Sequence, residues 1–438
     1  MKKLFLLLCA SCSVSAALAA EQKSPVALPS VQSSLQAKLE GIFDFQSGFR
    51  NQSKLKGNDK KMSDNRDDFA FKTTAAFAAT VTNAVDDIKY GAKIVLLPTT
   101  KPKSGVGYNG SHLFLESDYG RVEIGAPHDA SAKMRVTGSD VAAGPGAWDA
   151  YAKLDYKDAK YMEIKPDFAT SGDYFFDIAF KTKISQLNDG TEPARKISYY
   201  TPEFKGLQFG ISYIPDSGNV GGAGITGGDN SKSGITKVQL ESVKDQHYYE
   251  INQNVKDAFA IGLSYKYNIA DGVDLKLAAT GEYGKSAKKI KEFDKNTAAA
   301  DAKDKPIAEY KLSDLKTYNL GAALTYGNFG YSVSYGSLGK SLTAKQYHKA
   351  GRDTRYYNGA AAYSQGPIKT SISYFKSNCF KNTVDVVTVG TEYKMLPGLL
   401  PYAEVAYFQA KGRPVYYPEA QKKKIKGTIA IIGARLKF

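Results

Sequence analysis

The stretch LQAKLEGIFDFQSGFR, residues 35–50, alternates between two kinds of side chain with a period of two. One set of alternate positions holds Leu, Ala, Gly and Phe, and the other holds Gln, Lys, Glu and Asp among its members. Successive side chains of a β-strand point to opposite faces, so the stretch is predicted to be a strand with one apolar and one polar face. It exceeds the roughly 5–6 residues of a usual globular strand and is long enough to cross a bilayer, which takes about 9–11 residues with tilt.

The same period of two recurs to the end of the chain. Five segments precede residue 126, at 35–50, 68–82, 87–97, 112–117 and 121–125. Ten more form pairs with tight Gly- or Pro-containing connections, and a last segment covers 425–438; the pairs are 195–201 with 207–214, 257–268 with 273–284, 317–326 with 329–336, 355–363 with 368–375, and 384–393 with 400–409. Short connections alternate with long polar ones, the layout of outer-membrane barrels. The sequence therefore predicts an all-β fold, a transmembrane antiparallel β-barrel of about 16 strands.

The composition alone resembles that of a soluble protein. The chain has 438 residues and a formal net charge of +15, and its mean hydropathy is −0.36. Outside the N-terminus no run of about 18 apolar residues occurs, which excludes a membrane-spanning helix. A barrel gives no strong hydropathy peak, because only its lipid-facing positions are apolar while the others line water. A soluble β-sandwich or propeller is the alternative, but it does not require the repeated contrast between short and long connections.

The N-terminus is predicted to be an export signal. Residues 1–20 combine two lysines, an apolar core and a small-residue cleavage site at Ala17-Leu18-Ala19, which is typical of a signal peptide. Residues 21–34 are interpreted as a flexible lead-in, and residues 35–438 as the barrel. After cleavage Cys379 is the remaining cysteine, so neither an intramolecular disulfide nor a cysteine-based metal site is expected.

Motifs for other functions do not fit their surroundings. The GAGITG of residues 222–227 matches a dinucleotide fingerprint, yet no strand leads directly into it and no helix follows. The GSLGKS of residues 336–341 lacks the first glycine of a phosphate-binding loop. His112 and His128 have no supporting metal-ligand spacing. We therefore expect no cofactor, no metal, no catalytic group and no nucleic-acid partner.

Several segments resemble a known family, the Gram-negative general porins, which are trimeric 16-stranded outer-membrane channels. Residues 197–207, ISYYTPEFKGL, are similar to the family's Tyr-x-Ser/Thr-Pro-x-Phe-x-Gly hairpin, and 115–125, LESDYGRVEIG, resemble the hairpin before its constriction loop. Residues 398–407, GLLPYAEVAY, resemble a late strand, with Pro401 as a departure. The terminal Phe438 resembles the signal by which such barrels are recognised for assembly. The resemblance implies a homotrimer in outer-membrane lipid, inserted by the barrel-assembly machinery.

The same resemblance implies where the pore is narrowest. The third loop, residues 126–194, is expected to fold inward, although residues 173–180 could instead add a short pair of strands. A basic wall would face acidic side chains of this loop. The wall candidates are Lys38, Lys72, Lys89, Lys93 and Arg121, and the loop candidates are Asp129, Asp140 and Asp149. Opposed charges across a water-filled gap create a transverse field that penalises apolar solutes.

The arrangement of the barrel and its charged constriction leads to an expected function. We expect passive diffusion of small hydrophilic solutes and ions, with a weak preference for anions because the early strands are basic. The alternative is a non-conducting surface protein, such as an adhesin, that acts through its long loops at 215–256 and 285–315.

Overall fold

A computed structural model describes the chain over residues 35–52, 69–98, 106–138, 140–144, 194–217, 235–239, 247–252, 255–286, 289–294, 308–342, 354–379, 382–412 and 423–438. Within these ranges the helix assigned is α3 (Ala130–Met134). No helix in the described part of the chain is long and apolar enough to span a membrane.

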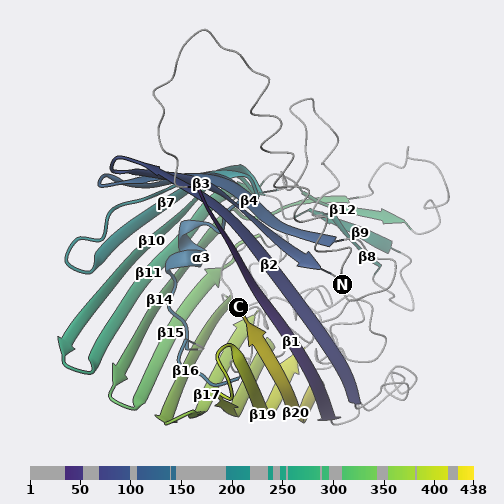
Figure 1. Cartoon of the computed structure of the whole chain (residues 1–438). Coiled ribbons are helices and arrows are strands. Elements are labelled where there is room, and N and C mark those ends of the chain that lie inside the picture. The colour runs from purple at the N-terminus through teal and green to yellow at the C-terminus, as the bar shows by residue number, and fades with distance from the viewer. Residues whose placement is uncertain are drawn as a thin grey trace, which may run out of the picture.

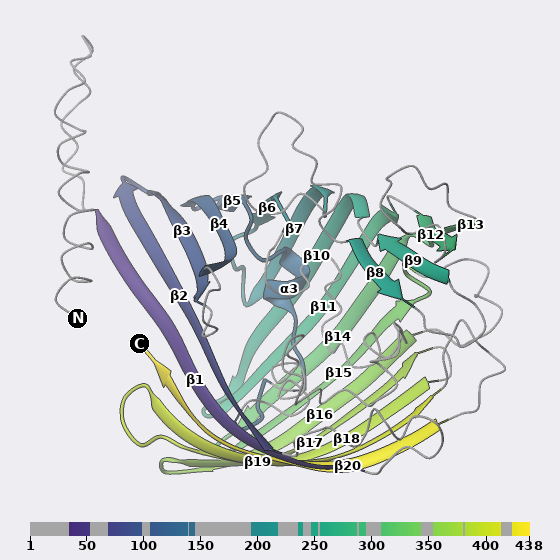
Figure 2. The same cartoon turned by 90° about the vertical axis from the view of Figure 1, so that its right-hand side faces the viewer.

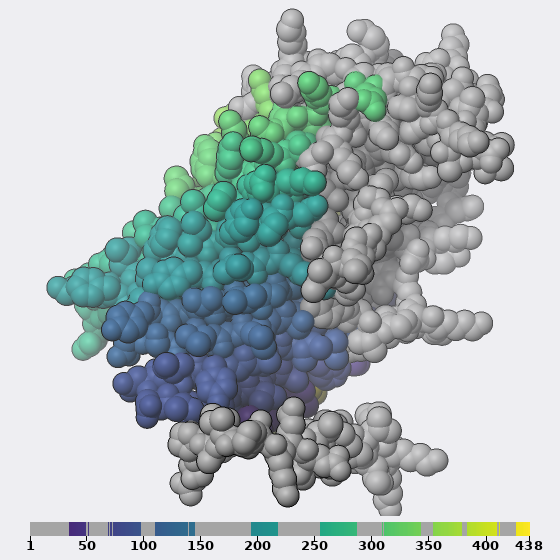
Figure 3. Space-filling model, turned by 90° about the horizontal axis from the view of Figure 1, so that it is seen from above, coloured from purple at the N-terminus to yellow at the C-terminus, as the bar shows by residue number. Residues whose placement is uncertain are grey.

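Sixteen strands close into one antiparallel barrel, as the alternating pattern predicts. Each strand pairs with its neighbours in chain order, and β1 closes the barrel against β20. The wall is visible in Figures 1 and 2, and its colours follow one another in chain order when seen from above in Figure 3. The strands are β1 (Gln36–Gln52), β2 (Phe69–Val85), β3 (Ile88–Pro98), β4 (Val106–Ser117), β5 (Gly120–Gly125), β6 (Lys196–Tyr200), β7 (Leu207–Asp216), β10 (Val255–Ala270), β11 (Val273–Ser286), β14 (Leu315–Tyr326), β15 (Phe329–Gly339), β16 (Thr354–Gln365), β17 (Ile368–Cys379), β18 (Asn382–Tyr393), β19 (Leu399–Gly412) and β20 (Lys423–Lys437).

Burial alternates along the strands and separates an inner from an outer face. On β16 the even-numbered residues from Thr354 to Ala362 are buried, whereas Tyr357 and Tyr363 are exposed. The exposed face holds the large apolar side chains along the barrel, such as Leu113, Ile372 and Val405. An exposed belt of this composition is what lipid contact requires, and aromatic residues gather toward both of its edges. Tyr335 packs against Tyr357 toward the long-loop end, with the two rings tilted and their centroids 5.1 Å apart.

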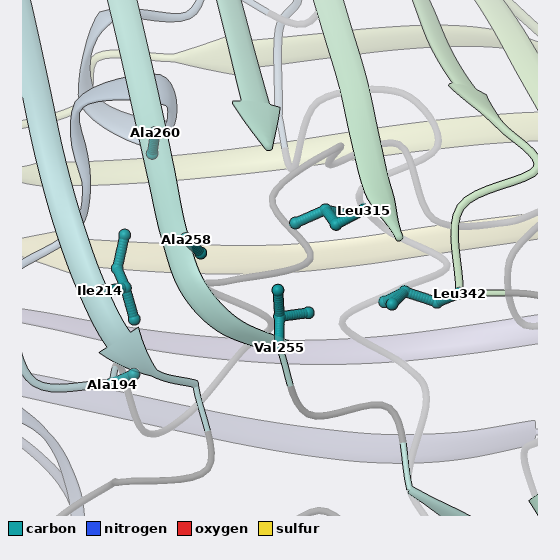
Figure 4. Close-up of a cluster of buried hydrophobic side chains, with 7 residues drawn as sticks. All are labelled: Ala194, Ile214, Val255, Ala258, Ala260, Leu315 and Leu342. Atoms are coloured by element: carbon teal, nitrogen blue, oxygen red, sulfur yellow. The ribbon is translucent and has the colours of Figure 1, made fainter. Parts of the chain in front are cut away.

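The inner face is not polar throughout, contrary to the simple alternation read from the sequence. Toward the long-loop end, β16 to β20 turn apolar side chains inward, and these are buried: Tyr356, Phe375, Val384, Val386, Phe408, Ile429 and Ile431. A second buried apolar cluster lies at the same end of β7, β10 and β14, where Ile214, Ala258 and Leu315 meet (Figure 4). The long-loop half of the lumen is therefore packed in part like a protein interior.

The long loops at 215–256 and 285–315 contain a second sheet, which sequence analysis did not anticipate. Its four strands are β8 (Ile235–Gln239), β9 (His247–Asn252), β12 (Lys289–Asp294) and β13 (Ala308–Lys311), in the order β13-β12-β9-β8. Because the chain leaves and re-enters the barrel at the long-loop ends of β7, β10, β11 and β14, the sheet sits at that end (Figure 2). Each strand is only four to six residues long, too short to stand out in a polar segment.

The C-terminal residue completes the closure of the barrel. The amide of Phe438 donates to the carbonyl of Gly41 at 3.1 Å, and the Gly41 amide donates to the Phe438 carbonyl at 2.8 Å. The phenylalanine ring occupies the space a side chain at Gly41 would need, since a Cβ there would lie 2.4 Å from the ring. The ring also lies near Phe77, with centroids 5.9 Å apart.

Candidate functional site: an inner belt and a charged wall

Residues 126–138 and 140–144 follow β5 and run along the inner wall of the barrel; we call these residues the inner belt. Its short helix α3 packs on β6, β7, β10 and β11, and the blue segment after α3 continues past β14 to β17 in Figure 1. Asp129 caps α3 by accepting a hydrogen bond from the amide of Ala132 at 2.9 Å. The described part of the third loop thus folds inward.

Glycines on the wall allow the inner belt to approach so closely. A Cβ at Gly210 or Gly262 would lie 2.7 Å from the sulfur of Met134. At Gly321 it would lie 2.1 Å from the carbonyl oxygen of Val136, which no backbone could tolerate. Side chains on these wall positions would displace the inner belt toward the axis of the pore.

Short polar side chains of the wall bind the backbone of the inner belt. Ser212 accepts from the amide of Ala130 at 2.9 Å, and Asn358 accepts from the amide of Gly138 at 2.6 Å. Ser332 donates to the Gly138 carbonyl at 2.7 Å, and Ser371 accepts from the amide of Ala143 at 2.8 Å. A buried loop backbone needs such partners, because unpaired buried amides and carbonyls are costly.

Charged side chains that are buried or half-buried hold the far end of the inner belt. Gly144 donates to Glu392 at 3.0 Å, and its carbonyl lies 3.5 Å from Nη1 of Arg435. Arg435 pairs with Asp44 at 3.0 Å, and the hydroxyl of Tyr402 donates to the same carboxylate at 2.6 Å. The inner belt is therefore tied to β18, β19 and β20 as well as to β6 and β7.

Beside the inner belt, β1 to β5 leave a charged stretch of wall. The Glu123 carboxylate, 3% exposed, pairs with Arg121 at 2.9 Å and with Lys133 of α3. Burial lowers the pKa of Lys133, and the carboxylate of Glu123 opposes that shift. Arg121 also pairs with Glu116 at 2.7 Å, and its guanidinium lies 4.1 Å from the ring centre of Phe114. Four charged side chains, two cationic and two anionic, thus converge in this part of the lumen.

Two hollows meet at this charged group. One, of about 570 Å³, is lined by Glu40, Lys93 and His112 among others, and the other, of about 550 Å³, extends toward the short connections at Asp118 and Glu203. Arg121, Glu123 and Lys133 line both hollows. A solute passing between them would meet these three side chains.

The predicted wall residues are distributed unequally. Lys38 and Lys93 both pair with Glu40, at 2.6 and 3.5 Å, and Arg121 belongs to the Glu123 group. Lys89 is exposed and lies opposite Glu116 in the register. Lys72 lies on β2 opposite Gln46, and its side chain is outside the described part of the chain.

The predicted loop acids are placed as follows. Asp129 is buried as the cap of α3, and Asp140 accepts a hydrogen bond from Thr137 at 2.9 Å. Asp149 and the segment 173–180 lie outside the described residues. Sequence reasoning missed Lys133 and the wall glycines, and it did not single out Glu123 among the charged inward positions of the early strands. A signal for Glu123 was available, because it occupies an inward position of the strand that carries Arg121.

Comparisons with known proteins agree with this architecture. A family model described as Gram-negative porin matches residues 6–413. The chain is 49% identical to an uncharacterized protein of Rickettsia conorii and 50% identical to one of Rickettsia felis, in each case over the full length of both chains. An anion-selective porin from Comamonas acidovorans has a similar structure, with a TM-score of 0.53, 14% identity, and coverage of 92% of this chain and all of the other. OmpT of Vibrio cholerae with one loop deleted, an outer membrane protein, gives a TM-score of 0.50 at 12% identity, covering 92% of this chain and 99% of that one.

Proposed function

Since the chain belongs to the Gram-negative porin family, an outer-membrane family, we propose that it is a water-filled channel for the passive diffusion of small hydrophilic solutes and ions. The observation that carries the proposal is the inner belt, held against the wall by glycines and hydrogen bonds, beside a charged stretch that lines two adjoining hollows. Such a lumen is narrowed but still lined by charge and water-compatible groups.

We propose a weak preference for anions. The stretch of wall on β1 to β5 together with α3 carries Lys38, Lys89, Lys93, Arg121 and Lys133, against Glu40, Glu116 and Glu123; Asp44 on β1 is paired with Arg435. All three of these glutamates have cationic partners, so their field on a passing ion is reduced, and the surplus is positive.

Planar-bilayer recordings of the purified protein test both statements. We expect discrete conductance steps and a reversal potential on the anion side in a salt gradient. Lys93→Glu should lower the anion-to-cation permeability ratio roughly severalfold, because a unit charge about 4 Å from an ion in water contributes about 1 kcal/mol. Lys205→Glu, in an exposed short connection, is the matched control and should leave the ratio unchanged. A wild-type channel that prefers cations would overturn the anion preference.

The second sheet is a reason to test the alternative function, a non-conducting surface protein that acts through its long loops. A folded sheet at the long-loop end offers a surface to a partner outside the barrel. If purified protein inserts into the bilayer without conductance steps, the diffusion channel is wrong and a surface role for this sheet replaces it.

We also propose a homotrimer, as the family resemblance implies. An apolar hollow of about 440 Å³ on the barrel surface over β2 to β5 is lined by residues such as Leu113, Leu115 and Ile124, and would suit contact with a neighbouring barrel. Chemical cross-linking of protein in native membranes should give a trimer band, and monomer alone would contradict the proposal. The export signal at residues 1–20, the lead-in at 21–34 and the assembly role of Phe438 remain part of the same proposal.

A further inference from the structure

The hollow of about 550 Å³ at the short-connection end of β4 to β7 has a charge pattern of its own; we call it the short-end hollow. Its charged lining consists of four carboxylates and two cations: Glu116, Asp118, Glu123, Glu203, Arg121 and Lys133. This surplus of carboxylates contrasts with the basic stretch of wall farther along the lumen.

The unlike charges of the short-end hollow are separated along the strand direction. Asp118 lies in the connection between β4 and β5, and Glu203 lies in the connection between β6 and β7. Arg121 lies opposite Tyr200 in the register, so both acids lie beyond it toward the end of the barrel. At about 3.3 Å per residue, the acids are roughly 6–10 Å from the level of Arg121. The short-end hollow therefore has a negative outer end and a positive inner end.

The cations of the inner end keep hydrogen-bond donors for a ligand. Arg121 donates to Glu123 through Nε and to Glu116 through Nη1, and its Nη2 has no partner in the described chain. Lys133 donates to Glu123, and an ammonium group carries three donors. The side chains of Arg121 and Lys133 are 30% and 31% exposed. A guanidinium beside an ammonium suits a carboxylate, which accepts several charge-assisted hydrogen bonds.

The acids of the outer end keep acceptors. Among the residues that the structure describes, Asp118 has neither an ion-pair nor a hydrogen-bond partner for its exposed side chain. Glu203 pairs with Lys266 at 2.9 Å through one of its two carboxylate oxygens. The outer end therefore offers carboxylate oxygens to an ammonium group.

The lining between the two ends suits a peptide backbone. Met134, Tyr200 and Pro202 contribute apolar surface there. Gln208 donates through Nε2 to the carbonyl of Thr201 at 3.1 Å, which leaves its Oε1 as an acceptor for an amide. A ligand that matches this lining has an ammonium group, an amide and a carboxylate in that order.

We propose that the short-end hollow binds short zwitterionic peptides, with the carboxylate at Arg121 and the ammonium group at Asp118. An extended peptide spans about 3.3–3.6 Å per residue, so two or three residues match the separation of the two ends. A single amino acid is too short to reach both. The inference rests on the proposed channel function, because it names a class of solute that the channel admits.

Interruption of the ion current by added peptide tests the proposal in planar bilayers. The probes are trialanine, N-acetyl-trialanine, which lacks the ammonium group, and trialanine amide, which lacks the carboxylate. The concentration dependence of the interruptions gives the affinity of each probe. We expect trialanine to bind about threefold to fivefold more tightly than either capped peptide, because each capped form loses one exposed ion pair. Equal affinity of trialanine and either capped peptide would overturn the proposal.

Asp118→Asn removes the unpaired carboxylate of the outer end and keeps the size of the side chain. It should weaken trialanine binding about threefold to fivefold and leave N-acetyl-trialanine binding unchanged, since that peptide has no ammonium group. Asp271→Asn, in the connection between β10 and β11, is the matched control and should bind trialanine like the wild type. Unchanged binding in Asp118→Asn, or an equal loss in the control, would contradict the proposed site.

Conductance without peptide separates this inference from the channel proposal. Discrete steps in both variants show that they fold and insert. If the wild type conducts and trialanine does not interrupt its current, the peptide site is wrong and the channel stands. If the wild type gives no steps, the channel is wrong and the inference falls with it.

Discussion

At the scale of single residues, Lys196 connects the two ends of the third loop. Its buried ammonium donates to the carbonyl of Pro127 at 2.6 Å, where the chain leaves β5, and to the carbonyl of Ala194, where it returns to β6. Replacing the ammonium group by an apolar one would leave both carbonyls without this donor. The buried lysine therefore holds the first and last residues of the third loop together.

Lys196→Met is expected to loosen the third loop while leaving the barrel closed. Losing a buried donor costs about 1–3 kcal/mol, so the thermal unfolding midpoint of the folded protein should fall. Open-channel current should become noisier, because the inner belt loses one of its anchors. Lys89→Met removes an exposed lysine from the same wall and should change neither quantity. An unchanged midpoint and current noise in Lys196→Met would show that the two carbonyls find other donors.

At the scale of elements, the inner belt can lie close to the wall because glycines there have no side chain.

The predicted strand positions agree with the structure to within a few residues for most strands, because a period of two is visible in every one of them. The contacts of the inner belt could not be predicted in the same way. Gly321 and Ser332 sit in ordinary strand patterns, and only the register of distant strands brings them against Val136 and Gly138.

The same reasoning explains the other differences between sequence and structure. The acids of the third loop were predicted from residue type alone to face the pore. The Asp129 carboxylate instead accepts a hydrogen bond from the amide of Ala132 and caps α3, which residue type alone does not predict. Glu123 occupies an inward position of β5, two residues from Arg121. Its pairing with Lys133 arises from the packing of α3 against the wall, and that packing has no local signature.

Gly321→Ala tests whether the wall glycines set the path of the inner belt. The added methyl group would lie 2.1 Å from the carbonyl oxygen of Val136, so the inner belt must move toward the pore axis. We expect a lower single-channel conductance and a loss of about 1–3 kcal/mol in the free energy of unfolding, as for other overpacked sites. Gly359→Ala, at an outward position, is the control and should conduct like the wild type. Normal conductance in Gly321→Ala would mean that the inner belt does not narrow the pore at this point.

At the scale of the whole molecule, a barrel has no free sheet edge only when its first and last strands meet. The pairing of β1 with β20 runs from Ile42 opposite Lys437 to Gln52 opposite Gly427, and Phe438 extends it to Gly41. The long-loop half of the lumen adds buried apolar contacts, and the second sheet adds a folded cap to the same end. In the described residues the second sheet has no counterpart at the short-connection end, so the two ends of the molecule are built for different surroundings.

Phe438 packs in the folded barrel, and we propose that recognition during assembly is a second, separable role of this residue. Phe438→Ala removes both, whereas Gly41→Leu blocks the seat of the ring and keeps the terminal residue. We expect Phe438→Ala to lower the amount of protein in the outer membrane of cells while still refolding in detergent micelles, where no assembly machinery acts. Gly41→Leu should reach the outer membrane at wild-type levels but unfold at a lower temperature. Equal loss of both variants from the membrane would mean that the ring matters through closure of the barrel and not as an assembly signal.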